Sequence, residues 1–324
     1  MLPTRIIRIS GARRAARRIK GCALVAMVAI IAGCNVAPAP LPVRIDLTAQ
    51  PNGIAVRPGD GALFITDDRS NAILWSSDRT AWAPYSTLPV IAGQANSLSQ
   101  LVFAQPGTLL VERFGFGEAG GLFVVSPEGD AQAFTGLATE RRRLGLASVG
   151  PGRALSSWFV KKENEPLTGG VSLVSYDVST HAAVERDLVV GLAKPVGIAT
   201  QGNSVLFVAD QSRGEILRYD LGALLAASAP VQGGTAFARI ESPDLLAIDR
   251  TGTLYTKCHA HSFCRVAPDG AVTSLADDFQ DARGVAIDNT RHVLYVVDRA
   301  KSASGTASAI RVFPLTDSDA NADH

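Results

Sequence analysis

Most of this chain consists of one repeated segment. Each copy has a turn, a short apolar strand, a second turn rich in Gly, Asn or Asp, a second strand, a loop and a third strand. A repeat of this kind predicts stacked units, because one unit cannot bury its apolar face alone. Four clear copies and two weaker ones start, in chain order, at Pro51, Gln100, Leu144, Pro195, Pro243 and Ala282.

The spacing of the copies predicts the architecture. Their first-strand anchors follow one another at steps of 47, 45, 52, 48 and 39 residues, and a unit of that length holds four short strands. The sequence therefore predicts an all-β fold, a six-bladed β-propeller of four-stranded blades over residues 43–315. Helical periodicity is scarce, and only 221–228 fits a helical turn or two. The anchors are Gly53, Gln100, Gly145, Gly197, Leu245 and Gly284.

One strand precedes the first copy. Residues 43–47 read VRIDL, and we expect this N-terminal strand to complete the last blade beside residues 310–313. That pairing closes the ring, which matters because an open ring leaves a free sheet edge.

The fourth copy, PVGIATQGNSVLFVADQSRGEILRYD, resembles an NHL repeat, a family whose copies carry P-x-G-I-A, V-x-V-A-D and R-I-x-x-[YF]-D elements. The resemblance covers roughly residues 43–315. It extends to the gluconolactonase/regucalcin-like and strictosidine-synthase-like propellers, which share P-[ND]-G-[IL]-A and Y-V-A-D segments. Repeat motifs of this kind specify a fold more strongly than a function.

The N-terminal segment resembles a bacterial lipoprotein signal. Residues 1–33 carry seven basic residues and no acid, and they end in the apolar run CALVAMVAIIAG. A basic region followed by a short apolar run and small residues is typical of an export signal. Ile31-Ala32-Gly33-Cys34 resembles a lipobox, which implies that Cys34 becomes the lipidated first residue. The alternative is a chance cysteine after an ordinary signal peptide.

The segments beside the propeller are expected to be unstructured. Residues 34–42 comprise the lipidated cysteine and a Pro/Ala-rich tether, and 316–324 form an acidic, disordered tail. Asn35 after Cys34 resembles an outer-membrane sorting pattern. We therefore expect a location in the bacterial cell envelope, on the periplasmic face of the outer membrane, with the membrane as a partner through the lipid.

The charge distribution excludes one class of partner. Residues 34–324 hold 24 basic and 30 acidic groups, a net charge of −6. A mildly acidic body lacks the basic surface that binding to DNA or RNA requires. We therefore expect no nucleic acid partner, and instead an envelope protein or a small molecule.

The loops at one end of the propeller hold the candidate ligand site. The residue before each anchor belongs to a predicted mouth ring, and the loops between second and third strands add to it. In gluconolactonase-like propellers a Glu, an Asn and an Asp hold a divalent cation, and this resemblance implies Asn52 and Asp244 as metal ligands for Ca, Zn or Mg. No motif supplies the family's Glu. The ring residues are Asn52, Ser99, Leu144, Val196, Asp244 and Arg283.

Two structural roles compete with the metal site. Asn52 and Asp244 fit turn-capping residues, and an ion pair between Asp244 and Arg283 is compatible with that role. The acids that end second strands, Asp68, Asp210 and Asp298, are expected to accept backbone N–H groups in the following loop.

A second local feature is the segment Cys258-His259-Ala260-His261-Ser262-Phe263-Cys264. Two cysteines that face each other across a hairpin are near disulfide distance, and an exported protein meets an oxidising compartment. We expect a Cys258–Cys264 disulfide, with His259 and His261 exposed on the ligand face. A soft metal site of the two thiolates and the histidines is the alternative.

The sequence leaves the catalytic residues unknown, because neither a G-x-S-x-G elbow nor a phosphate-binding loop occurs in it. The sequence favours a lipid-anchored binding or interaction module of the cell envelope. The alternative is a metal-dependent hydrolase of the lactonase/esterase type.

Overall fold

The computed structural model describes residues 43–90, 97–105, 107–116, 120–301 and 307–315. The expected signal peptide, the lipidated Cys34, the tether and the acidic tail lie outside the described residues. Within the described ranges, no helix is long and apolar enough to cross a membrane.

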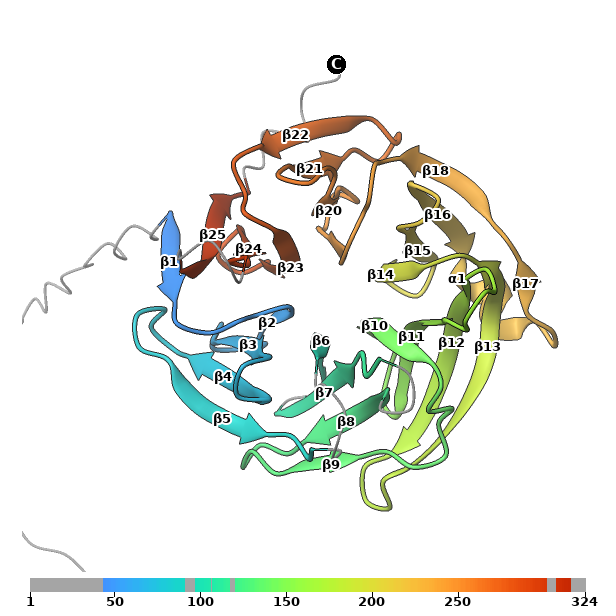
Figure 1. The fold of residues 1–324 in the computed structure, drawn as a ribbon, viewed down its shortest axis with the longest axis horizontal. Helices are drawn as coiled ribbons and strands as arrows, with labels where there is room; N and C mark the ends of the chain where they lie inside the picture. The colour runs from blue at the N-terminus through green and yellow to red at the C-terminus, as the bar shows by residue number, and fades with distance from the viewer. Residues whose placement is uncertain (1–42, 91–96, 106, 117–119, 302–306, 316–324) are drawn as a thin grey trace, which may run out of the picture. The chain divides into compact units, whose positions relative to one another are not determined.

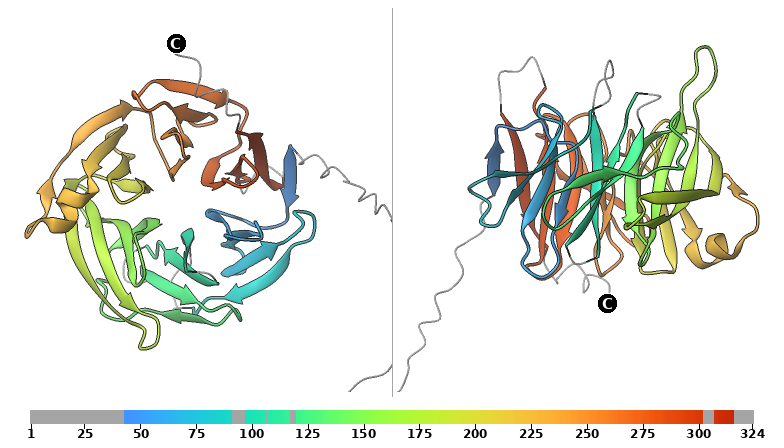
Figure 2. Two further views of the ribbon diagram at one scale, coloured as in Figure 1. Left: turned by 180° about the vertical axis from the view of Figure 1, so that it is seen from behind. Right: turned by 90° about the horizontal axis from the view of Figure 1, so that it is seen from below.

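The described residues form a ring of six sheets around a central axis (Figure 1). In each sheet the first strand lies nearest the axis and the later strands lie progressively farther out (Figures 1 and 2). The predicted all-β, six-bladed propeller is confirmed.

Three blades come from the first part of the chain, and their strands pair in sequence order. Blade 1 contains β2 Ile54–Val56, β3 Leu63–Asp67, β4 Ala72–Ser76 and β5 Ala83–Thr87. Blade 2 contains β6 Leu98–Gln105, β7 Thr108–Arg113, β8 Gly121–Val125 and β9 Ala131–Ala133. Blade 3 contains β10 Arg142–Ser148, β11 Arg153–Val160, β12 Thr168–Asp177 and β13 Ala182–Leu192.

The other three blades follow the same order, except that the last one ends with the N-terminal strand. Blade 4 contains β14 Pro195–Gln201, β15 Val205–Asp210, β16 Glu215–Asp220 and β18 Thr235–Arg239. Blade 5 contains β19 Ala247–Ile248, β20 Leu254–Lys257, β21 Phe263–Val266 and β22 Val272–Ala276. Blade 6 contains β23 Ala282–Asp288, β24 Val293–Asp298, β25 Ser308–Pro314 and β1 Arg44–Leu47.

The N-terminal strand closes the ring as the sequence predicts. β1 pairs antiparallel with β25, and Ile45 lies opposite Ile310. Ile45 and Leu47 face inward and are buried, whereas their neighbours Arg44 and Asp46 are exposed. The alternation is that of a strand with one face on the core.

The hydrophobic core lies between neighbouring blades. The second strands β3 and β24 are buried at every position, since each is covered by a blade on both faces. The outermost strands are more exposed, as in β22. One cluster joins Ile54 and Leu63 of blade 1 to Tyr295 and Ile310 of blade 6, so the ring is held by apolar contacts between blades.

Blade 4 carries an insertion that the repeat does not predict. Between β16 and β18 the chain forms the short helix α1 Leu221–Ala226 and the strand β17 Val231–Gln232. The helix confirms the helical turn expected at 221–228. β17 pairs in parallel with β13 of blade 3, so that blade has a fifth strand.

The anchor glycines let the innermost strands pack closely at the axis. A Cβ placed on Gly197 would lie 2.7 Å from the backbone nitrogen of Leu246 in blade 5 and would also meet the carbonyl of Asp244. Gly53, Gly145 and Gly284 approach the backbone of a neighbouring blade in the same way. The repeated glycine therefore sets the spacing of the mouth residues.

Candidate functional site

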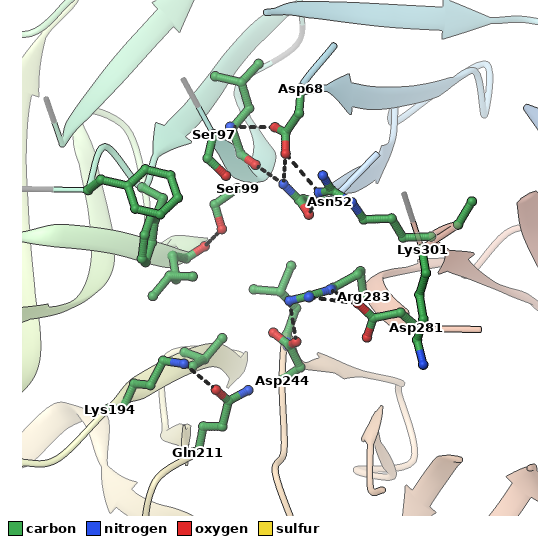
Figure 3. A pocket seen from close by; sticks show the side chains of 18 residues that line it. Asn52, Asp68, Ser97, Ser99, Lys194, Gln211, Asp244, Asp281, Arg283 and Lys301 are labelled. Carbon is green, nitrogen blue, oxygen red and sulfur yellow. Dashed lines mark hydrogen bonds and ion pairs between the residues drawn. The ribbon is translucent and has the colours of Figure 1, made fainter. Parts of the chain in front are cut away.

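The candidate site is a cavity of about 700 Å³ at the mouth of the propeller (Figure 3). It is built from the loops before the innermost strands and the loops between second and third strands, which is the face that the sequence indicated. The structure brings all six residues of the predicted mouth ring to its wall: Asn52, Ser99, Leu144, Val196, Asp244 and Arg283.

One side of the cavity is a hydrogen-bonded group around Asn52. The Asn52 Nδ2 donates to Asp68 Oδ2 at 2.7 Å and to the carbonyl of Leu98 at 2.8 Å. Arg299 comes from the loop after β24, and its Nη1 donates to Asn52 Oδ1 and to Asp68 Oδ2, the latter at 2.8 Å. Both ends of the Asn52 amide are therefore bonded within the protein.

Another side of the cavity is an ionic chain centred on Arg283 (Figure 3). Its Nη1 lies 3.3 Å from Asp244 Oδ2 and its Nη2 lies 2.7 Å from Asp281 Oδ2. Lys257 Nζ donates to the other oxygen of Asp281 at 2.7 Å. The Asp244–Arg283 ion pair, which is compatible with the turn-capping role considered for Asp244, is present, and Asp281 joins it.

The pKa values of this chain follow from burial and pairing. Burial acts to raise the pKa of Asp281, but Arg283 and Lys257 outweigh it and hold that pKa below its usual range. Burial likewise opposes the charge on Arg283, yet Asp244 and Asp281 raise its pKa. Asp281 and Arg283 are therefore charged at neutral pH.

Lys194 lies at a third corner of the cavity (Figure 3). Its Nζ donates to Gln211 Oε1 at 2.6 Å, and Gln211 donates in turn to the carbonyl of Pro243 at 3.3 Å. Burial lowers the pKa of Lys194. The negative charge of Asp244 acts to raise this pKa, and the positive charge of Arg283 lowers it further.

The acids that end second strands position the loops that carry Lys194 and Asp281, by accepting hydrogen bonds from their backbone. Asp210 accepts the N–H groups of Ala193 and Lys194 at 2.8 and 2.9 Å, and Asp298 accepts those of Gln280 and Asp281 at 2.8 and 3.2 Å. Their predicted structural role is correct, but the loop they hold precedes the innermost strand rather than following their own strand.

In blade 1 this role belongs to a neighbour of the residue that the sequence indicated. Asp67 accepts the N–H of Gln50 at 2.7 Å. Asp68 Oδ1 instead accepts the N–H of Leu98 in blade 2 at 2.9 Å, and its carboxylate lines the cavity.

The donor set does not fit a resident divalent cation of the kind implied for Asn52 and Asp244. Calcium and magnesium need several oxygen ligands free to converge. Here Asn52 Oδ1 accepts from Arg299 and Asp244 Oδ2 faces Arg283, so guanidinium groups occupy the position that a cation would need. Within the described ranges, no group of three or more His, Cys, Asp or Glu side chains is arranged to hold a metal.

The hairpin of blade 5 carries the predicted disulfide between Cys258 and Cys264. Both cysteines are buried in the apolar cluster between blades 4 and 5. His259 and His261 are exposed, as expected, but they do not line the mouth cavity. His259 Nδ1 lies 2.9 Å from Glu241 Oε2, and His261 Nδ1 lies 2.7 Å from the carbonyl of Phe279.

Several site residues were missed from the sequence, and a simple signal would have found most of them. Ser97, Lys194 and Asp281 line the cavity, and each stands three positions before its blade's anchor. The same position in blade 3 is Arg142. A side chain three positions before the anchor therefore also reaches the wall of a hollow in these blades.

Comparison with known proteins identifies the fold. No protein-family model matches the chain, and no curated protein sequence matches it. Solved structures do. Regucalcin from Agrobacterium tumefaciens, described as a calcium-binding protein, has a TM-score of 0.63 at 14% identity, over 85% of this chain and 97% of that chain.

Two enzymes have the same fold. A gluconolactonase from Xanthomonas campestris has a TM-score of 0.61 at 16% identity, over 84% of this chain and 88% of that chain. A luciferin-regenerating enzyme has a TM-score of 0.62 at 12% identity, over 85% of this chain and 96% of that chain. Identities this low establish the architecture alone, and the chain has the six-bladed β-propeller fold that these proteins share.

Proposed function

We propose that the protein binds a small organic anion in the mouth cavity. The observation that carries this proposal is the pairing of every carboxylate among the described lining residues. Asp68 pairs with Arg299, and Asp244 and Asp281 pair with Arg283. The described lining residues include three carboxylates and four cationic side chains, the latter being Lys194, Arg283, Arg299 and Lys301.

The net charge of the mouth cavity is opposite in sign to that of residues 34–324 as a whole. Residues 34–324 have a net charge of −6, whereas the described lining of the cavity has an excess of one positive charge. A concave site with excess positive charge attracts anions and raises their local concentration. Guanidinium groups also suit carboxylates, since they present several N–H donors in one plane.

The test measures citrate binding by isothermal titration calorimetry. Arg299→Gln removes one cation from the mouth and leaves Asp68 bonded to Asn52 and Leu98, so we expect citrate affinity to fall at least tenfold. The control is Arg250→Gln, which removes an exposed arginine in the turn between β19 and β20. Equal affinity in the Arg299 and Arg250 variants, or no citrate binding at all, contradicts the proposal.

Hydrolysis of lactones or esters is a second candidate. It is favoured by the gluconolactonase fold and by the place of Asp244 at the mouth. It predicts turnover of a lactone panel with Ca, Zn or Mg present, and loss of that turnover in Asp244→Asn. Because Asp244 already pairs with Arg283, binding without hydrolysis is the better-supported function.

The proposal includes a place in the cell envelope, with the membrane as partner through a lipid on Cys34. Its support is the lipobox-like segment Ile31-Ala32-Gly33-Cys34, which lies at the end of the apolar run. The test is palmitate labelling and membrane fractionation of the full chain expressed in a Gram-negative host. Cys34→Ala is expected to lose the label and leave the membrane fraction, and retention of both would overturn the assignment.

A further inference from the structure

A second hollow of about 350 Å³ lies beside the mouth cavity. Phe114 and Lys194 line both, so the two hollows share a wall. Arg142 and Phe159 complete the inner part of the second hollow, and the loop between β11 and β12 forms its rim through Lys161, Glu165 and Leu167. We call Phe114, Phe116, Phe159, Arg142 and Lys194 the aromatic groove.

Three phenylalanines form the apolar part of the aromatic groove. The Phe114 ring lies edge-on to Phe116 at 4.8 Å between centroids and tilted toward Phe159 at 5.8 Å. Phe159 is buried, but the side chain of Phe116 is 55% exposed. Phe116 lines the mouth cavity, next to Phe114, which lines both hollows. Its exposed ring therefore offers apolar surface to a ligand rather than to the core.

The backbone of Phe116 has an unfavourable conformation. Its φ is +49°, and it follows Gly115, whose φ is +75°. A bulky residue in the left-handed region is a rare conformation, and such residues are found disproportionately at ligand-binding sites.

Two cations flank the rings without a carboxylate partner. The Arg142 guanidinium lies 5.4, 5.9 and 5.8 Å from the centroids of Phe114, Phe116 and Phe159, and Lys194 Nζ lies 5.8 Å from that of Phe159. No ion pair joins Arg142 or Lys194 to a carboxylate of the described residues, unlike Arg283 and Arg299 in the mouth.

We propose that the aromatic groove binds a planar aromatic carboxylate. Its ring would lie against Phe114 and Phe116, and its carboxylate would pair with Lys194 and Arg142. Apolar ring surface beside unpaired cations complements a ligand that has both features, and stacking and ion pairing together select it against aliphatic anions and neutral aromatics. This inference names the ligand class of the mouth site and so rests on the proposed function.

The test compares three probes by isothermal titration calorimetry: 2-naphthoate, its neutral analogue 2-naphthamide, and citrate. We expect 2-naphthoate to bind at least tenfold more tightly than the amide. Lys194→Met keeps the apolar stem and removes the charge, and it is expected to weaken naphthoate at least tenfold. Phe116→Ser is expected to weaken naphthoate several-fold, because it removes ring surface that naphthoate would stack on. It should leave citrate unchanged, because citrate has no ring and Phe116 has no charge.

The matched control is Lys162→Met. Lys162 lies in the same β11–β12 loop but lines neither hollow. It is exposed and pairs with Glu165 at 3.7 Å, so its loss is expected to change none of the affinities. A further readout is pH, since naphthoate affinity is expected to fall as the pH rises through the lowered pKa of Lys194.

The outcomes separate the two proposals. Naphthoate binding no tighter than that of the amide, or insensitive to both Lys194→Met and Phe116→Ser, overturns the aromatic groove. If citrate binding is still lost in Arg299→Gln, the proposed anion function survives that result. If neither anion binds, both proposals fail.

Discussion

Glu112 lies near the end of β7 and is completely buried between blades 2 and 3. Ser156 donates to its Oε1 at 2.5 Å, and Arg143 donates to that serine hydroxyl at 3.1 Å. Arg143 is itself paired with Glu185 at 3.0 Å. Burial dominates, and it raises the pKa of Glu112 to about 8 against the lowering by Ser156 and Arg143.

Glu112→Gln is expected to stabilise the protein above pH 4.5 and to have little effect below it. In the wild type, the unfolded chain ionises Glu112 from about pH 4.5, whereas the folded chain keeps it protonated until about pH 8. Folding therefore loses free energy as the pH rises between those values, by a few kcal/mol in total. The Glu112→Gln variant has no such loss of folding free energy, because glutamine does not ionise.

The measurement is urea unfolding of both proteins at pH 4 and pH 8. The free energy of unfolding should be similar at pH 4 and higher for the variant at pH 8. An exposed residue, Glu128, supplies the control through Glu128→Gln, which should show no such pH dependence. A difference that is the same at both pH values would contradict a neutral Glu112.

The candidate site was only partly predictable from single residues. Asn52, Asp244 and Arg283 were found because each precedes a repeat anchor, and the anchors fix where the innermost strands begin. Lys194 and Arg142 also share a repeat position, three residues before the anchor, but their role in the site comes from neighbours far away in sequence, including Phe114. Which acid pairs with which base depends on contacts between blades, and the repeat does not encode these contacts.

At the scale of one element, the innermost strand depends on its glycine. Gly197→Ala is expected to lower the free energy of unfolding by about 1–3 kcal/mol, because the added methyl group would meet the backbone of Leu246 and Asp244. It should also weaken citrate binding, since Asp244 lies at the mouth. Thermal unfolding and calorimetry measure the two effects.

Gly121→Ala is the matched control for that substitution. Gly121 also lies in a strand, but an added Cβ there has its nearest neighbour at 3.5 Å, an ordinary contact with the Phe123 ring. Its stability should be unchanged or slightly higher. Equal destabilisation at both glycines would mean that the cost comes from strand conformation and not from the contact between blades.

The β20–β21 hairpin offers a second prediction at this scale. The double variant Cys258→Ala/Cys264→Ala is expected to have a free energy of unfolding about 2 kcal/mol lower than the wild type, because the disulfide restricts a short loop of the unfolded chain. Both side chains are buried, so alanine also leaves small voids. Thermal melts with and without a reducing agent check this, and a melting temperature that the reductant does not change in the wild type would contradict it.

At the scale of the whole molecule, the fold could be predicted almost completely. The repeat period fixed the number of blades, and the apolar strand at 43–47 indicated the closure, because both are patterns of local sequence. The fifth strand of blade 3 was not predicted. β17 is two residues long and exposed, so it has no apolar pattern, and its pairing depends on where the insertion after α1 meets β13.

Ring closure should be worth several kcal/mol. A chain that starts at residue 43 retains β1, whereas one that starts at 49 lacks it and loses the buried Ile45 and Leu47, each worth about 1.5–3 kcal/mol. The shorter chain should melt at a lower temperature than the longer one. It should also associate at raised concentration, because β25 would expose an unpaired edge.

Calorimetry and size-exclusion chromatography of the two chains measure these effects. Ile45→Ala in the longer chain is a milder variant that keeps β1 paired with β25 while removing part of its apolar contact, so it should fall between the two in stability and stay monomeric. Blades 1 and 6 also meet through Arg79, whose Nε donates to the Tyr295 hydroxyl at 2.9 Å. If that contact and the apolar cluster around it were enough to close the ring, both chains would melt alike and neither would associate, and β1 would then be an accessory strand.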